Sequence, residues 1–309
     1  MKVNQLKYFL AIVEAGSLSG AAQNLGVAQP ALSQHIANLE QELDVALLER
    51  SSRGVSSTSA GDLLYEHART IVRQIERAET DVRHLGQSPS GEIVVVLAAS
   101  VSQIVSPPLA KRVAERLPEV NLLIQEGMSI NLARLVESGR ADLAFVPSGI
   151  LPSGVESEQI LVEDLVLGGA KGSEGDAEGA IDFEAACQFP LVLPSRPHYV
   201  RNTLEQAAFD QGLRLNIKAE QDSPRLLPRL VASGYAYSIL PQNGFFEDQS
   251  LDGIFTRKIV KPDISRSLHI LWPKAASQDR LTVEVKSVLR EVITALSISG
   301  QVRGSLKTV

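Results

Sequence analysis

The side chains of this chain best suited to recognition chemistry lie near its N-terminus. Gln29, Ser33, Gln34 and His35 fall within residues 28–39, a stretch without acidic residues. Amide, hydroxyl and imidazole groups can exchange hydrogen bonds with the edges of DNA bases in the major groove. The pattern therefore predicts a helix that contacts DNA through these four side chains.

Two short helices joined by a tight corner would hold these side chains in place. Ser17 can cap the first helix, and Ala21 leaves room for the second helix to pack closely. Gly26 supplies the positive φ that the corner needs, and Pro30 stands in the first turn of the second helix, where a missing N–H costs nothing. This is the pattern of a helix-turn-helix, which we place at residues 18–37.

A small β-hairpin is expected next, with its turn at residues 51–54. It would form a wing and complete a DNA-binding domain at residues 1–58. Arg50 and Arg53 flank the turn, where Arg53 could contact phosphate or the minor groove, or remain a solvated turn charge. The second helix should run to about Leu43, with Ile36, Leu39 and Leu43 facing inward. The candidate DNA-contacting residues are Ser17, Ala28, Gln29, Pro30, Ser33, Gln34, His35, Arg50 and Arg53.

Residues 59–86 have the pattern of one long helix for dimerisation. Apolar residues recur at alternating steps of four and three, the spacing of a coiled-coil seam. The seam consists of Leu64, Ala68, Ile71, Ile75, Ala78, Val82 and Leu85. The alternative is a helix that packs only on its own domain, although a strict seam is narrower than such a helix usually shows. Residues 87–91 read as a hinge.

From residue 92 the pattern changes to alternating strands and helices, typical of an α/β domain. A β-branched run at residues 92–98 predicts a buried strand, and a helix is expected at residues 106–116. A final strand follows a complete second α/β unit, which indicates two lobes joined by two crossings near residues 161–164 and 263–266. We assign residues 92–161 and 267–309 to the first lobe, and residues 162–266 to the second.

Hydroxyl groups follow the predicted strands of the first lobe, at the sheet edge where open α/β folds bind ligands. Ser100 and Ser102 follow the first strand, Ser129 opens the next helix, and Pro147 and Ser148 end a third strand. Hydroxyls and free N–H groups at helix N-termini suit a carboxylate or phosphate. The expected ligand is a small anionic metabolite, although Ser100 and Ser129 could equally be plain helix caps.

Composition and motifs exclude several other classes of protein. The net charge is −6, which argues against a nonspecific nucleic-acid binder. The first sixty residues are not basic either, since Lys2, Lys7, Arg50 and Arg53 are outnumbered by Glu14, Glu40, Glu42, Asp44 and Glu49.

No phosphate-binding loop, nucleophile elbow or metal-ligand spacing appears, so we expect neither an enzyme nor a bound metal or cofactor. Cys187 is the only cysteine and reads as a small buried side chain. No apolar signal segment or membrane span is visible, so a cytoplasmic protein is expected.

The order and spacing of these motifs resemble the LysR-type transcriptional regulators over nearly the whole chain. The most specific matches lie at residues 6–9, 16–22, 28–36, 39–40, 47–55 and 58–61. Residues 65–79 look closest to the nitrogen-assimilation-control subgroup, and residues 193–198 and 233–241 are similar to the family's co-inducer domain. The resemblance implies a winged helix-turn-helix, a dimerising linker helix and a two-lobed sensor domain like periplasmic binding proteins. It also implies a homodimer or a homotetramer built as a dimer of dimers.

The resemblance also assigns roles to single residues. Family positions that contact bases or phosphates fall on Gln29, Pro30, Ser33 and Arg53. Many members carry Arg where this chain has Gln34, so the preferred DNA sequence should differ. The family's effector positions fall on Ser100, Ser129 and the loop that contains Ser195, Arg196, His198 and Tyr199. Arg196 and His198 are the cationic candidates there, although Arg196 could simply be exposed on its turn.

The expected function is sequence-specific transcriptional regulation at a dyad-related site in double-stranded DNA. A small effector bound in the cleft would rotate the subunits and change DNA bending and contact with RNA polymerase. Two alternatives stay open: a regulator that needs no effector, as some members of the same subgroup are thought to be, and a cytosolic protein that binds a small molecule.

Overall fold

The computed structural model describes residues 1–51, 54–83, 88–127, 129–147, 149, 151–245 and 253–307, without the side chains of residues 81, 83 and 129–131. The chain divides into two units. The first comprises residues 1–87 with residues 138–140, and the second comprises residues 88–137 and 141–309. No helix among the described residues is long and apolar enough to cross a membrane.

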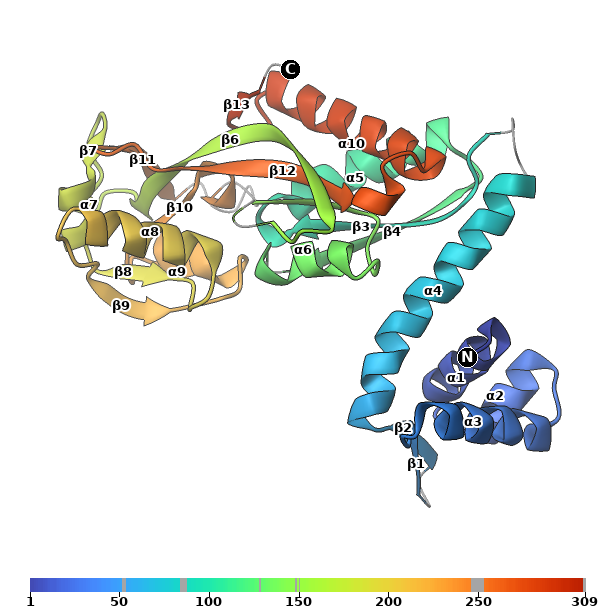
Figure 1. Cartoon of the computed structure of the whole chain (residues 1–309). Coiled ribbons are helices and arrows are strands. Elements are labelled where there is room, and N and C mark those ends of the chain that lie inside the picture. Colours follow the sequence, from blue (N-terminus) through green and yellow to red (C-terminus); the bar gives the residue numbers. More distant parts are fainter. Residues whose placement is uncertain are drawn as a thin grey trace. The chain divides into compact units, whose positions relative to one another are not determined.

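The first unit contains the predicted helix-turn-helix, drawn in blue in Figure 1. Its helices are α1 (Val3–Ala15), α2 (Leu18–Leu25) and α3 (Gln29–Leu43). Their inner faces form a core that includes the fully buried side chains of Phe9, Ile12, Leu32, Ile36 and Leu39. Leu43, which we expected to face inward, is 40% exposed, because α3 ends at this residue and the chain turns away at Asp44, whose φ is 54°.

The corner between the helices has the predicted local structure. Gly16 ends α1 with a φ of 61°, and Gly26 ends α2 with a φ of 65°. The Ser17 hydroxyl caps α2 by accepting a hydrogen bond from the backbone N–H of Gly20 at 3.1 Å. Pro30 lies in the first turn of α3, where it removes no helical hydrogen bond.

The wing consists of the antiparallel strands β1 (Leu48–Ser51) and β2 (Gly54–Ser57). Two contacts fix it against the helices. The backbone N–H of Val55 donates to the Gly16 carbonyl at 2.8 Å, and Glu40 Oε1 on α3 accepts from the backbone N–H of Leu47 at 2.8 Å. These two hydrogen bonds hold the base of the wing beside α3.

The predicted seam residues on the long helix α4 (Ser59–Arg83) fall into two groups, one packed in the headpiece core and one at least partly exposed. Ala68 is fully buried in the core of its own headpiece, and Leu64 packs against the same core. Val72, which was not part of the predicted seam, is also buried there, because residues four apart share a helix face. By contrast, the apolar side chains of Ile71 and Val82 are exposed, Val82 by 77%.

The first lobe of the second unit is a β-sheet packed against helices. Its strands run in the order β4 (Val120–Gly127), β3 (Gly91–Ala98), β5 (Leu143–Pro147), β12 (Ser265–Pro273) and β6 (Val155–Ala170). The helices are α5 (Ala99–Arg116), α6 (Ser129–Glu137) and α10 (Arg280–Ile298), and η3 (Lys274–Ala276) is a short 3₁₀ turn. A core cluster drawn from residues 93–161 and 268–302 joins them.

The second lobe has a separate core drawn from residues 165–264. The far half of β6 pairs with β10 (Ser238–Pro241) and β11 (Ile254–Val260), and β11 pairs with β7 (Ile181–Asp182). A small parallel sheet joins β8 (Leu191–Leu193) and β9 (Ile217–Glu220). The helices are α7 (Phe183–Gln188), α8 (Tyr199–Asp210) and α9 (Leu226–Ala232), with a 3₁₀ helix, η1, at Gln242–Phe245.

Strands β6 and β12 run side by side from one lobe to the other (Figure 1). Their antiparallel register pairs Arg266 with Glu163 and Ser265 with Asp164. The short C-terminal strand β13 (Ser305–Leu306) pairs with β6 at Leu161 and Val162. The two lobes therefore share a double-stranded crossing with Glu163 and Arg266 at its middle.

Helix α5 and strand β11 are among the elements that differ from the sequence-based expectation. Helix α5 begins at Ala99, directly after β3, and not at residue 106. Pro107 and Pro108 look like a helix start because proline is favoured there, but here they lie inside the helix. Strand β11 was not predicted, because Arg257 and Lys258 interrupt its apolar pattern.

Candidate nucleic-acid interface and ligand cavity

The outer face of α3 carries the polar side chains that were expected to contact DNA. Gln29, Pro30 and Gln34 are exposed, and Ser33 and His35 are partly exposed. The opposite face of the helix is buried in the headpiece core, which leaves the polar face to solvent. Ala28, the residue that precedes α3, is also exposed.

A hydrogen bond joins the wing to the polar face of α3. Nη2 of Arg50 on β1 donates to the Ser33 hydroxyl at 3.1 Å. A cationic side chain therefore lies beside the polar face of α3. Arg53 lies outside the described residues.

Other contacts hold individual side chains of α3 in place. Nε2 of Gln34 donates to Oδ1 of Asn38 at 2.9 Å, one turn further along the helix. The His35 ring packs on the Tyr8 ring with 5.0 Å between centroids. The Ser17 hydroxyl, another candidate, is engaged as the cap of α2.

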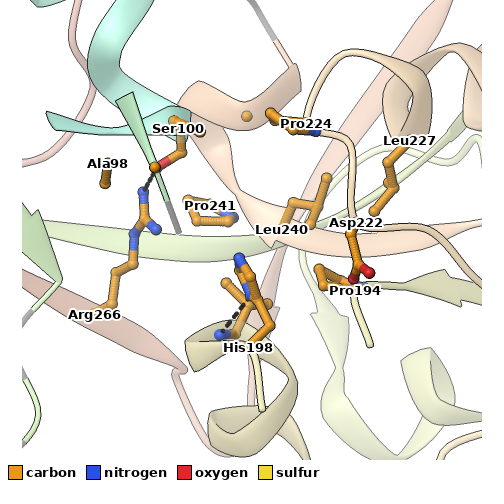
Figure 2. Close-up of a pocket in the computed structure, with 14 residues that line it drawn as sticks. Ala98, Ser100, Pro194, His198, Asp222, Pro224, Leu227, Leu240, Pro241 and Arg266 are labelled. Atoms are coloured by element: carbon orange, nitrogen blue, oxygen red, sulfur yellow. Dashed lines mark hydrogen bonds between the residues drawn. The ribbon is translucent and has the colours of Figure 1, made fainter. Parts of the chain in front are cut away.

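The second unit contains a cavity at the crossing between its two lobes. The space open to the centre of a water molecule measures about 70 Å³. Polar groups come from Ser100, His198, Asp222 and Arg266 (Figure 2). The remaining lining residues are apolar or small: Ala98, Ala99, Gly127, Pro194, Val200, Pro224, Leu227, Leu240, Pro241 and Gly244.

Arg266 supplies the cation of this cavity. It is 3% exposed, and its Nε donates to Oε2 of the fully buried Glu163 at 2.6 Å. Its Nη2 donates to the Ser100 hydroxyl at 2.8 Å (Figure 2). Because Glu163 faces Arg266 across the crossing strands, the pair neutralises a charge that would be costly to bury alone.

The buried carboxylate is also tied to the second lobe and to the C-terminal segment. Nδ2 of Asn243 in η1 donates to Oε1 of Glu163. The same amide binds the backbone of Arg303 twice, donating to its carbonyl at 2.9 Å and accepting from its N–H at 2.8 Å. Glu163 therefore has hydrogen-bonding partners on both of its oxygens.

His198 lies between the charged groups of the cavity. Its Nδ1 accepts from the backbone N–H of Val200 at 3.2 Å and caps α8. Burial lowers the pKa of His198, and the Arg266 charge lowers it further, while Asp222 acts in the opposite direction. The ring is therefore neutral near pH 7, and since Nδ1 accepts, Nε2 carries the proton.

Asp222 supplies the anionic group at the mouth of the cavity. It accepts from the backbone N–H of Ser195 at 2.8 Å, and from the Ser195 hydroxyl at 2.7 Å and 2.9 Å. The hydroxyl and the N–H of Ser195 lower the pKa of Asp222 below its ordinary value, so the carboxylate is ionised at neutral pH. Its side chain is open to solvent.

The structure brings together only part of the predicted effector set. Ser100 and His198 line the cavity, and Ser195 reaches it through Asp222. Arg196 is instead exposed and forms a two-bond ion pair with Glu205 at 2.8 Å and 2.9 Å. Ser102 is buried within α5 beside Ser106, while Pro147, the last residue of β5, and Tyr199, the first of α8, are not among the described residues that line the cavity.

Part of the predicted set lies outside the described residues, and two residues of the cavity were not predicted to belong to it. Ser148 and Leu85 lie outside the described residues, as does the side chain of Ser129. Arg266 was assigned from sequence only to a crossing segment, and Asp222 was not singled out. A signal for Arg266 was present, because the two predicted crossing segments carry opposite charges at positions that face each other in antiparallel strands.

The described residues contain no group of three or more His, Cys, Asp and Glu side chains that could hold a metal ion. Cys187 is buried in α7, as expected, and its burial raises the pKa of the thiol to about 11. A thiol with so high a pKa is a poor nucleophile at neutral pH.

Comparisons with known proteins extend over both units. Residues 3–62 match the family described as "Bacterial regulatory helix-turn-helix protein, lysR family", and residues 86–294 match "LysR substrate binding domain". The "Nitrogen assimilation regulatory protein nac" of Klebsiella aerogenes is 34% identical, over 97% of this chain and 98% of that protein. The protein of the same name from Escherichia coli K12 is also 34% identical, over 96% of each chain.

Solved structures share the fold at lower sequence identity. A full-length OxyR variant from Pseudomonas aeruginosa has a TM-score of 0.75 at 22% identity and covers 95% of this chain, which covers 94% of that one. Full-length CbnR complexed with its target DNA has a TM-score of 0.68 at 23% identity, with coverage of 94% and 100%. These likenesses concern the fold of the chain.

Proposed function

The chain belongs to the LysR family of bacterial DNA-binding transcriptional regulators, and we propose that it recognises its DNA site through the outer face of α3 and the wing. The observation that carries this proposal is the bond between Arg50 and Ser33. This bond places a cation at the edge of a helix whose exposed face offers amide and hydroxyl groups. A side chain suited to the DNA phosphate backbone therefore lies next to side chains suited to the edges of the bases.

The N-terminal part of α3 supplies the base contacts in this proposal. Gln29 and Gln34 are exposed amides, and an amide can pair with both adenine groups in the major groove. Ser33 and His35 lie on the flanks of the same face, and Ala28 and Pro30 contribute small apolar contacts. Arg53 would contact the phosphate backbone or the minor groove beyond Arg50.

The exposed part of α4 supports dimerisation. Leu64 and Ala68 serve the headpiece core, so the proposed seam consists of Ile71, Ile75, Ala78 and Val82, extended by Leu85. An isolated headpiece should bind DNA weakly, because it is not basic and phosphate neutralisation supplies most of the affinity. A dimer or tetramer with half-sites roughly 10 bp apart, or multiples of that spacing, would compensate by joining several headpieces.

The cavity between the lobes is the proposed effector site. A small ligand with a carboxylate or similar group could bind at Arg266, Ser100 and His198. It would regulate the protein only if it bound one subunit arrangement better than the other. That change would alter DNA bending and contact with RNA polymerase. We place this activity in the cytoplasm, where bacterial DNA lies.

The DNA-reading role is tested by substitutions on α3 and a matched control. Gln29→Ala should lower the affinity for the protein's own promoter site about 5- to 150-fold, since one good base contact contributes about 1–3 kcal/mol. Gln41→Ala removes the same exposed amide at the other end of α3 and should change affinity less than twofold. Both are measured by mobility shift at fixed salt against random competitor DNA. Equal losses for the two variants would contradict the assignment.

The dimer seam is tested separately by sedimentation. Val82→Asp should shift the protein toward monomers at micromolar concentration, whereas Arg69→Asp, on an exposed position of the same helix, should leave the assembly intact. A Val82→Asp protein that remains fully dimeric would exclude this part of α4 as the interface.

A further inference from the structure

The charges around the cavity do not match a simple anion. Arg266 is the cation of the lining, but Glu163 balances it at 2.6 Å inside the protein, so the pair adds no net charge. Asp222 is a carboxylate whose described hydrogen-bonding partner is the neutral Ser195. With a neutral His198, the groups at the cavity sum to one negative charge, which disfavours a ligand that is only anionic.

The hydrogen-bonding groups of the cavity fall into two sets. Among the described residues, neither Nη1 of Arg266, nor the hydroxyl hydrogen of Ser100, nor Nε2–H of His198 has an acceptor, and all three belong to the lining. These groups can donate to a carboxylate. Asp222 can only accept, and a carboxylate has about four acceptor positions, more than Ser195 fills.

The two sets occupy different sides of the cavity. In Figure 2, Arg266 and Ser100 lie on one side, Asp222 and Leu227 lie on the other, and His198 and Leu240 lie between them. Both Arg266 and Asp222 act on the pKa of His198, which places them within electrostatic reach of the same ring. A ligand that satisfies both sides must carry an acceptor group at one end and a donor group at the other.

The enclosed part of the cavity suits a small ligand. A space of about 70 Å³ for water centres corresponds to about five to seven water-sized positions at 10–15 Å³ each. Leu227, Leu240, Pro194 and Pro241 supply apolar contacts for a short carbon skeleton. A ligand of about six non-hydrogen atoms would therefore fill it.

We propose that the effector is a small zwitterion of the amino-acid class, with its carboxylate at Arg266, Ser100 and His198 and its ammonium group at Asp222. This inference rests on the proposed effector site and names its ligand. The zwitterion is neutral overall and places opposite charge against each side of the cavity. The charged hydrogen bonds at both ends give it selectivity over acids without an amino group.

Matched small probes test the class of ligand on the full-length protein. The amino acids are alanine, serine and β-alanine, and each is paired with the acid in which a hydroxyl replaces the ammonium: lactate, glycerate and 3-hydroxypropionate. Calorimetric titration should show that at least one amino acid binds, and that its hydroxy acid binds at least tenfold more weakly. Asp222→Asn should reduce that ratio to less than threefold, while Asp210→Asn, an exposed carboxylate on α8 outside the lining, should leave it unchanged.

Two results would overturn the inference. One is a hydroxy acid or a dicarboxylate that binds as tightly as the best amino acid. The other is a panel in which no amino acid binds. Mobility shifts on the same protein samples separate the outcomes, because intact promoter binding with failed ligand selectivity rejects the ligand class while leaving the DNA-reading role in place.

Discussion

Replacing Glu163 by glutamine should destabilise the second unit strongly, because it leaves the charge of Arg266 buried without a carboxylate. Glu163 is 0% exposed and Arg266 is 3% exposed, so water cannot take over the lost interaction. Removing one partner of such a pair typically costs about 3–5 kcal/mol in the free energy of unfolding. One of the two carboxylate oxygens also becomes an NH₂ group, so either Arg266 or Asn243 loses its acceptor.

Glu158 on the same strand provides a matched control. Its partner is Arg290, whose side chain is 45% exposed, so Glu158→Gln removes an ion pair that water can replace. The expected cost is about 0–1 kcal/mol. A double variant, Glu163→Met with Arg266→Met, removes both buried charges and should recover most of the loss, because an apolar pair needs no compensation.

The assay can follow the second unit alone. Trp272 is the only tryptophan of the chain and packs in the core cluster of the first lobe, so its fluorescence reports unfolding there. With an m-value of about 3 kcal/mol/M in urea, Glu163→Gln should lower the midpoint by about 1–1.7 M. Equal midpoints for Glu163→Gln and Glu158→Gln would refute the reasoning that burial makes this pair important.

Three further predictions concern other parts of the chain. Gly61→Ala should destabilise the headpiece, because an added Cβ would clash with the Leu47 carbonyl oxygen, and this outweighs the helix preference of alanine. A melting temperature by far-UV circular dichroism that is no lower than that of the parent chain would contradict this. Affinity for a carboxylate ligand should rise as the pH falls below neutrality. Burial and the Arg266 charge lower the pKa of free His198 and the ligand's charge raises it, so binding takes up a proton. His198→Asn should flatten this dependence in titrations between pH 5.5 and 8, and an unchanged slope would exclude His198. Cys187 should react with a thiol reagent only on unfolding, since burial raises the pKa of its thiol to about 11, and fast labelling of the native protein would disprove that placement.

The burial of Cys187 also predicts how the protein responds to peroxide. Here a single cysteine cannot form a disulfide within one chain, and its thiol is buried. Peroxide should therefore leave promoter binding by this protein unchanged at concentrations that oxidise exposed, low-pKa thiols.

The sequence alone determined the DNA-binding domain because its signals are local. The cap at Ser17, the positive φ at Gly26 and the proline in the first turn of α3 each depend on a few neighbouring residues. Local backbone preferences act the same way in a short segment as in a folded protein. The order of strands and helices was readable for the same reason, except where prolines lie inside α5.

Only the tertiary structure decided which polar side chains form the cavity. Ser100, His198, Asp222 and Arg266 come from segments far apart in the chain. The hydrogen bond between Arg266 and Ser100, and the position of the other two beside it, depend on how the two lobes fold onto the crossing strands. Arg196 looked equivalent to a cavity cation by type and position, but it pairs with Glu205 at the surface. The sequence shows which side chains can be charged. Burial and ion pairs between residues far apart in the chain determine which of those charges is available to a ligand in the cavity.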